Sequence, residues 1–263
     1  MPSERFLWLH KLKMSRMQNT PKNVVLLPHT AVGEAVRRAA KARLYRKLGY
    51  NVYVSSTSQL KSNPEAFELL FQKNPYIAGA KTPDPDDLID GIVAEKDPFR
   101  RNTFDPGILR QPDFSEEERQ IQIHYLPKRM PGLEETTILD LNISSYRLDE
   151  RRDSFSNVAA YVRKHYPGAL AILRSDYDLE EREFGPLPVA AEFDSIDFGT
   201  IYDYCDIASS CKKMICLQTG SLPIACYYNR TVDCLRTEGF RADPTDRNRL
   251  LFIDCDFADI DVR

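Results

Sequence analysis

The amino-acid sequence predicts an α/β fold in which each half of the chain builds a parallel sheet, and two observations carry this prediction. Residues 24–56 have the pattern of a buried strand, a short loop, a long helix and a second strand. The strand–loop–helix order returns after Thr136, beyond a proline-rich middle. Such alternation is typical of right-handed βαβ units over a parallel sheet. We therefore expect two Rossmann-like βαβ domains that face one cleft.

The first domain is expected over residues 21–131, after an N-terminal extension of residues 1–20. The helix that begins near Glu34 has an apolar face at i, i+4 spacing, and Gly49 is a suitable end for it. Basic residues occupy the remaining arc of this amphipathic helix: Arg37, Arg38, Lys41, Arg46 and Lys47. A strand at 51–56, a helix at 63–72 and a turn at 74–77 into a third strand follow.

The middle of the chain, residues 82–131, holds seven of the 17 prolines and few strand signals. We interpret it as loops and an interdomain connection. One helix is expected there, because Ser115 and Glu118 form a capping box ahead of residues 119–126.

The second domain is expected over residues 132–263. Its predicted strands are 137–143, 169–173, 213–217 and 250–253. Its predicted helices are 155–166, 202–210 and one that begins at Leu222.

Composition indicates a soluble globular protein, with 42% hydrophobic and 29% charged residues. The net charge of −3, with both signs interspersed, argues against a nucleic-acid partner. No apolar run is long enough to span a bilayer, and the N-terminus lacks the features of a secretory signal. The six cysteines contain no CxxC pair, so we expect free, mostly buried thiols in a reducing cytoplasm and no structural metal.

The candidate for proton transfer is Glu34, which falls where the first loop becomes a helix. The helix dipole stabilises a carboxylate there by about 0.3–1 kcal/mol, which favours an ionised group that can accept a proton. Helix capping is the alternative interpretation, because acidic residues commonly occupy this turn. His29, in the same loop, could contact a ligand, although a loop histidine is commonly just solvated.

Two loops of the second half are candidates for phosphate binding. The turn Thr219–Gly220–Ser221 precedes a helix, and its small residues would let the backbone approach an anion. Pro223 is compatible with the first turn of that helix. The loop after strand 137–143 offers hydroxyls and guanidinium forks, which suit a diphosphate: Ser144, Ser145, Arg147 and Arg151. A solvated helix start, with Asp149 and Glu150 pairing the arginines, is the alternative.

Taken together, these features resemble the heptosyltransferase family of glycosyltransferases (family 9 type), whose fold is GT-B. The resemblance lies in Gly33-Glu34 opening a helix, in residues 69–79 (LLFQKNPYIAG) and in residues 201–225 with their threonine-glycine-serine turn. No P-loop, GxGxxG, nucleophile elbow or HExxH motif is present.

The resemblance implies a cytoplasmic, metal-independent enzyme that transfers a sugar, with inversion, from a nucleotide diphosphate donor to an unidentified acceptor hydroxyl. No cofactor beyond the nucleotide sugar is implied. Glu34 would be the base, and His29 and Gly33 would lie on the acceptor side. The donor diphosphate would bind both candidate loops: Ser144, Ser145, Arg147, Arg151, Thr219, Gly220 and Ser221.

Three features depart from the family pattern. Glu34 replaces an aspartate, Pro223 stands where a histidine is common, and the chain is short. They keep open a catalytically lapsed GT-B-like module that binds a nucleotide sugar or a protein. A sugar transferase acting on modified nucleic-acid bases is a further alternative, against which the slight acidity counts.

Overall fold

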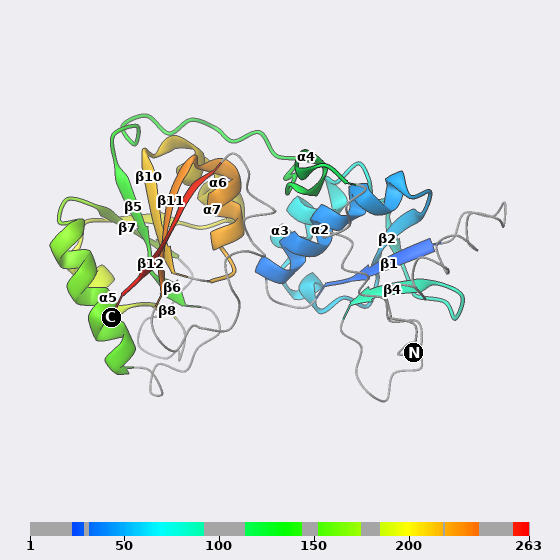
Figure 1. Ribbon diagram of the computed structural model, residues 1–263, viewed down its shortest axis with the longest axis horizontal. Coiled ribbons are helices and arrows are strands. Elements are labelled where there is room, and N and C mark those ends of the chain that lie inside the picture. Colours follow the sequence, from blue (N-terminus) through cyan, green and yellow to red (C-terminus); the bar gives the residue numbers. More distant parts are fainter. Residues whose placement is uncertain are drawn as a thin grey trace. The chain divides into compact units, whose positions relative to one another are not determined.

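The computed structural model describes residues 23–28, 32–91, 114–143, 152–174, 185–217, 219–236 and 255–262. The chain divides into two compact units, Met1–His124 and Tyr125–Arg263, and each unit contains a parallel sheet with helices packed on it (Figure 1). The predicted α/β class is therefore confirmed. In the described part of the chain, no helix combines the length and the apolar character that crossing a membrane would require.

The sheet of the first unit has four parallel strands in the order β3-β2-β1-β4. These are β1 (Asn23–Leu27), β2 (Asn51–Ser55), β3 (Ala80–Lys81) and β4 (Leu88–Gly91). The helix α2 (Val32–Lys47) connects β1 to β2, as predicted, and Gly49 follows it with a φ of +88°. The three central residues of β1 are fully buried, which places this strand in the core.

The predicted helix at 63–72 is confirmed, with an irregular course. It follows η1 (Gln59–Ser62) and consists of α3 (Pro64–Phe67) and a π-helical continuation, η2 (Glu68–Gln72). The Asn63 side chain accepts from the Ala66 amide, which caps α3. The Asn74 side chain then donates to the Ala39 carbonyl, so the turn after this helix is fastened to α2.

Two expectations for the first unit need correction. β4 was not predicted, because its sequence, LIDG, offers few apolar residues and includes an aspartate. The capping box of Ser115 and Glu118 is confirmed, but the helix that it starts, α4, is only Glu116–Arg119. The predicted helix at 119–126 is wrong, because the chain is not helical after Arg119. Ile121 and Ile123 are both buried, and burial at every second residue is typical of an extended chain.

The second sheet has six parallel strands in the order β12-β11-β10-β5-β7-β9. They are β5 (Thr137–Asp140), β7 (Leu170–Arg174), β9 (Ser195–Phe198), β10 (Lys213–Leu217), β11 (Thr231–Arg236) and β12 (Asp256–Asp261). The helix α5 (Arg152–His165) lies on one face, and α6 (Ile201–Ser210) and α7 (Leu222–Tyr228) lie on the other (Figure 1). This is the doubly wound strand order of a Rossmann fold.

Short elements complete this unit. The ladder of β6 (Asn142–Ile143) and β8 (Gly185–Pro186) is antiparallel, and η6 (Pro188–Glu192) precedes β9. The segment before β5 belongs to this unit as well, because the Tyr125 hydroxyl and the Lys128 amide both donate to Asp206 of α6.

The core of the second unit follows the alternation of its strands. Leu139 and Leu141 pack with Val158 and Val162 of α5 in one buried cluster. All six cysteines are free and five are buried, which confirms the prediction of free, mostly buried thiols. β9, β11 and β12 were not predicted, and the expected strand at 250–253 lies outside the described residues.

Close packing of β1 against β4 predicts the effect of a methyl group on Gly91. A Cβ there would lie 2.6 Å from the Leu27 Cβ and 2.8 Å from the Leu27 carbonyl oxygen. We expect Gly91→Ala to lower the free energy of unfolding by about 1–3 kcal/mol, measured by urea denaturation. Gly168→Ala is the control, because no atom lies within 4 Å of its added Cβ. Equal stability of the two variants would contradict the close packing.

An ion pair between β3 and the start of β4 predicts part of the acid sensitivity. Burial by itself raises the pKa of Asp87, but hydrogen bonds from Lys81, the Asp84 amide and Asn23 outweigh it, so that the pKa lies below its usual value. This carboxylate therefore contributes stability above about pH 4, the ordinary aspartate value, and that contribution is lost as the pH falls through the lower folded value.

We expect Lys81→Met to be less stable than wild type at pH 7 and to lose less stability between pH 5 and about 2, in thermal melts across that range. Lys212→Met is the control, since it removes an exposed ion pair with Glu135 from the other unit. Parallel acid profiles for wild type and Lys81→Met would show that this pair does not stabilise the fold.

Candidate functional site

The second sheet has a topological switch point between β5 and β10. These strands are neighbours, yet the helices that follow them, α5 and α7, cover opposite faces of the sheet. In open α/β sheets, ligands bind at the carboxyl ends of such strands. Both predicted phosphate-binding loops follow these strands in the sequence, one after β5 and one after β10. Of their residues, Ser144, Ser145, Arg147 and Arg151 lie outside the described residues.

A buried carboxylate joins the two strands at this point. Asp140 is the last residue of β5, and it is only 1% exposed. Its Oδ2 accepts from the Ser221 hydroxyl at 2.6 Å and from the Tyr204 hydroxyl at 2.8 Å. Its Oδ1 accepts from the Asn142 side-chain amide at 2.9 Å. Thr219 extends the network, with its hydroxyl 3.0 Å from that of Ser221. The turn after β10 is therefore fastened to the end of β5.

Strand alternation explains why Asp140 points this way. Its neighbours Leu139 and Leu141 face the core beneath α5, so Asp140 faces the side covered by α6 and α7. Ser221 occupies the N-cap position of α7, where its side chain makes no capping bond, and its hydroxyl donates to Asp140. Pro223 lies in the first turn of α7, as predicted.

Tyr204 acts as a hydrogen-bond donor in this network because its hydroxyl is buried. Burial, followed by the charge of Asp140, raises the pKa of Tyr204 well above its ordinary value, so this hydroxyl keeps its proton. The sequence analysis missed both Asp140 and Tyr204. An aspartate inside the apolar run TILDL was the signal that could have found the site.

The hydrogen bond from Tyr204 to Asp140 predicts a loss of stability when it is removed. We expect Tyr204→Phe to lower the free energy of unfolding by about 1–3 kcal/mol, because a buried acceptor loses a donor. Tyr227→Phe is the matched control, since Tyr227 is 38% exposed. Urea denaturation of both variants measures the difference, and equal values would contradict a structural role for this bond.

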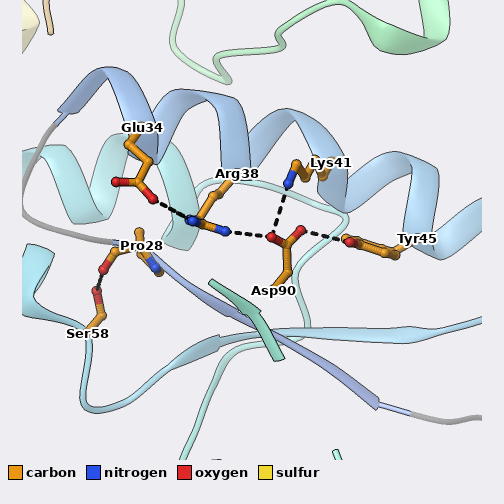
Figure 2. Close-up of polar contacts among 7 residues, drawn as sticks. All are labelled: Pro28, Glu34, Arg38, Lys41, Tyr45, Ser58 and Asp90. Carbon is orange, nitrogen blue, oxygen red and sulfur yellow. Dashed lines mark hydrogen bonds and ion pairs between the residues drawn. The ribbon is translucent and has the colours of Figure 1, made fainter. Parts of the chain in front are cut away.

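A second cluster lies on one face of the first sheet, between α2 and β4 (Figure 2). Glu34 is in the first turn of α2, as predicted, and its side chain is 27% exposed. The Oε1 of Glu34 accepts from Arg38 twice, from Nε at 3.1 Å and from Nη2 at 2.5 Å. The Nη1 of the same guanidinium donates to Asp90 Oδ1 at 2.5 Å. Arg38 thus bridges two carboxylates.

Asp90 is the buried centre of this cluster. It is 0% exposed, and it also accepts from Lys41 at 3.1 Å and from the Tyr45 hydroxyl at 2.7 Å. Two carboxylates and two cations therefore balance in charge. Arg38 and Lys41 belong to the basic arc of this helix, yet both residues are only 8% exposed. Their burial depends on Asp90, which the sequence analysis did not single out.

The remaining predicted residues of this corner are placed in part. Gly33 lies in α2 directly before Glu34, and His29 is outside the described residues. The Ser58 hydroxyl donates to the Pro28 carbonyl at 2.8 Å, which fastens the end of β1 to the start of η1 (Figure 2). Within the described ranges, no group of three histidine, cysteine, aspartate or glutamate side chains could hold a metal ion.

Comparison with known proteins finds similarity in structure alone. No protein-family model matches the chain, and no curated protein matches it. A dodecameric, iron-containing glycosyltransferase, TibC, from enterotoxigenic E. coli matches 82% of this chain with a TM-score of 0.52 and 14% identity. A structure of heptosyltransferase TibC in complex with ADP-D-β-D-heptose gives the same TM-score at 12% identity. The fold is that of the GT-B-like glycosyltransferases.

A glycosyl transferase family 9 protein from Veillonella parvula also matches, with a TM-score of 0.47 and 9% identity over 91% of this chain and 86% of its own. The chain spans 58% of the length of the two TibC structures. At these identities the likeness to the TibC structures concerns the fold, and it confirms the resemblance to heptosyltransferase structures that the sequence indicated.

Proposed function

We propose that the chain binds a nucleotide diphosphate sugar through its second unit and transfers the sugar, with inversion, to an acceptor hydroxyl. The observation that carries this proposal is the turn Thr219–Gly220–Ser221, held by Asp140 at the switch point of a doubly wound sheet. The complex of TibC with ADP-D-β-D-heptose makes an ADP-linked heptose the first donor to test. The free, buried thiols fit action in the cytoplasm.

In this proposal, Glu34 is the base. Both hydrogen bonds from Arg38 go to Oε1, and no described residue donates to Oε2. Oε2 takes the proton of the acceptor hydroxyl as the acceptor oxygen bonds to the anomeric carbon. The bond from that carbon to the diphosphate breaks at the same time, and its electron pair leaves with the nucleoside diphosphate. The proposal assigns Gly33 and His29 to acceptor binding.

The donor diphosphate contacts the turn after β10, where Thr219 and Ser221 supply hydroxyls and Gly220 leaves the backbone open to approach. The loop after β5 supplies further hydroxyls and the guanidinium groups that neutralise the leaving diphosphate: Ser144, Ser145, Arg147 and Arg151. The nucleotide sugar is the co-substrate, and the proposal needs no other cofactor or metal.

Nucleoside diphosphate release tests the base. We expect Glu34→Gln to lower the turnover number at least 100-fold with ADP-heptose or another nucleotide sugar, because the amide cannot accept the proton. Donor affinity, measured by calorimetry, should stay unchanged, because in this proposal the donor binds through the second unit. Ser221→Ala is the converse variant, with weakened donor affinity expected.

The outcomes separate the candidate functions. Equal turnover in wild type and Glu34→Gln would show that Glu34 is not the base. Donor binding without turnover, in wild type and across a panel of nucleotide sugars, would instead favour the catalytically lapsed binding module.

A further inference from the structure

We infer that Asp90, acting through Arg38, positions the carboxylate of Glu34 for proton transfer. The two are positioning residues, because neither needs to touch the reacting atoms. This inference rests on the proposed function, since it assigns a task to the surroundings of the proposed base. The inference goes beyond the proposed function because it names the buried groups that orient the side chain of that base.

The first step is the rigidity of Asp90. It belongs to β4, where it pairs in register with Leu26 of β1. Lys41 and Tyr45 hold its two oxygens independently of Arg38, at 3.1 and 2.7 Å. The next residue, Gly91, pairs with Leu27 of β1, and a Cβ added to it would lie 2.6 Å from the Leu27 Cβ. Asp90 is therefore a fixed point beneath α2.

The second step is the geometry of the guanidinium. Arg38 uses three nitrogens, Nη1 toward Asp90 and both Nε and Nη2 toward Glu34 (Figure 2). Because the guanidinium is planar and rigid, fixing one edge on Asp90 also fixes the edge that Glu34 meets. The Arg38 side chain is only 10% exposed, so solvent competes little for these bonds.

The third step is the need for such an anchor. Glutamate has one more rotatable bond than aspartate, and holding such a side chain in one rotamer costs up to about 2 kcal/mol of entropy. The Glu34 side chain lies in the first turn of α2 and is 27% exposed, so part of it meets solvent. The fork of Arg38 holds Oε1 and leaves Oε2 for a hydroxyl. A lysine in its place has one nitrogen and cannot bridge both carboxylates with fixed geometry.

The test is a double-mutant cycle with Arg38→Lys and Glu34→Gln, assayed by nucleoside diphosphate release. We expect Arg38→Lys to lower the turnover number about 10-fold or more in the wild-type background, with an unchanged KM for the donor. In the Glu34→Gln background it should cause no further fall, because the group that it positions is already inactive. Arg46→Lys is the matched control, since Arg46 lies on the same helix and donates to the Tyr50 carbonyl and the Asn51 side chain.

Three results would overturn the inference. They are an unchanged turnover number in Arg38→Lys, an equal fall in both backgrounds, and a fall of the same size in Arg46→Lys. If Glu34→Gln abolishes turnover and Arg38→Lys does not lower it, only the positioning role fails. If Glu34→Gln itself leaves turnover unchanged, the proposed base fails and the inference fails with it. Should Arg38→Lys not fold, Asp90→Asn takes its place in the same cycle, with the same expected loss of additivity.

Discussion

A carboxylate buried beside the end of a parallel strand needs several donors, because an unpaired buried charge is far too costly to persist. Both units of this protein contain such a group, Asp90 on β4 and Asp140 on β5. Each one draws side chains from other elements onto itself. The side chains of the candidate functional residues are held by these two carboxylates. Arg38 donates to both Asp90 and Glu34, and Ser221 donates directly to Asp140.

The two carboxylates are satisfied by different chemistry, and this difference suits different tasks. Asp90 is neutralised by cations, one of which also holds the partly exposed Glu34. Asp140 is held by neutral donors, two hydroxyls and an amide. The first arrangement holds a carboxylate that remains partly exposed, which suits the base proposed above. The second holds the turn after β10 against the end of β5 at the switch point, which suits the proposed nucleotide-sugar site.

Local sequence patterns predicted the elements whose stability is local. The path from β1 through α2 to β2, the helix α5 and the capping box of Ser115 have periodicity or capping residues that identify them. β4, β9, β11 and β12 were missed, because aspartates interrupt their apolar patterns and these strands form by pairing with neighbours distant in sequence. The capping box fixed where α4 begins, while burial of Ile121 and Ile123 decided where it ends.

The same division holds for the candidate sites. The sequence by itself placed Glu34 at the start of a helix and Thr219–Ser221 at the turn before another, since both follow from adjacent residues. Only the tertiary structure decided their partners. Arg38 meets Asp90 across 52 residues, and Ser221 meets Asp140 across 81. Those contacts depend on the order of the strands in each sheet, which is set by long-range hydrogen bonding and burial and leaves no mark at either residue alone.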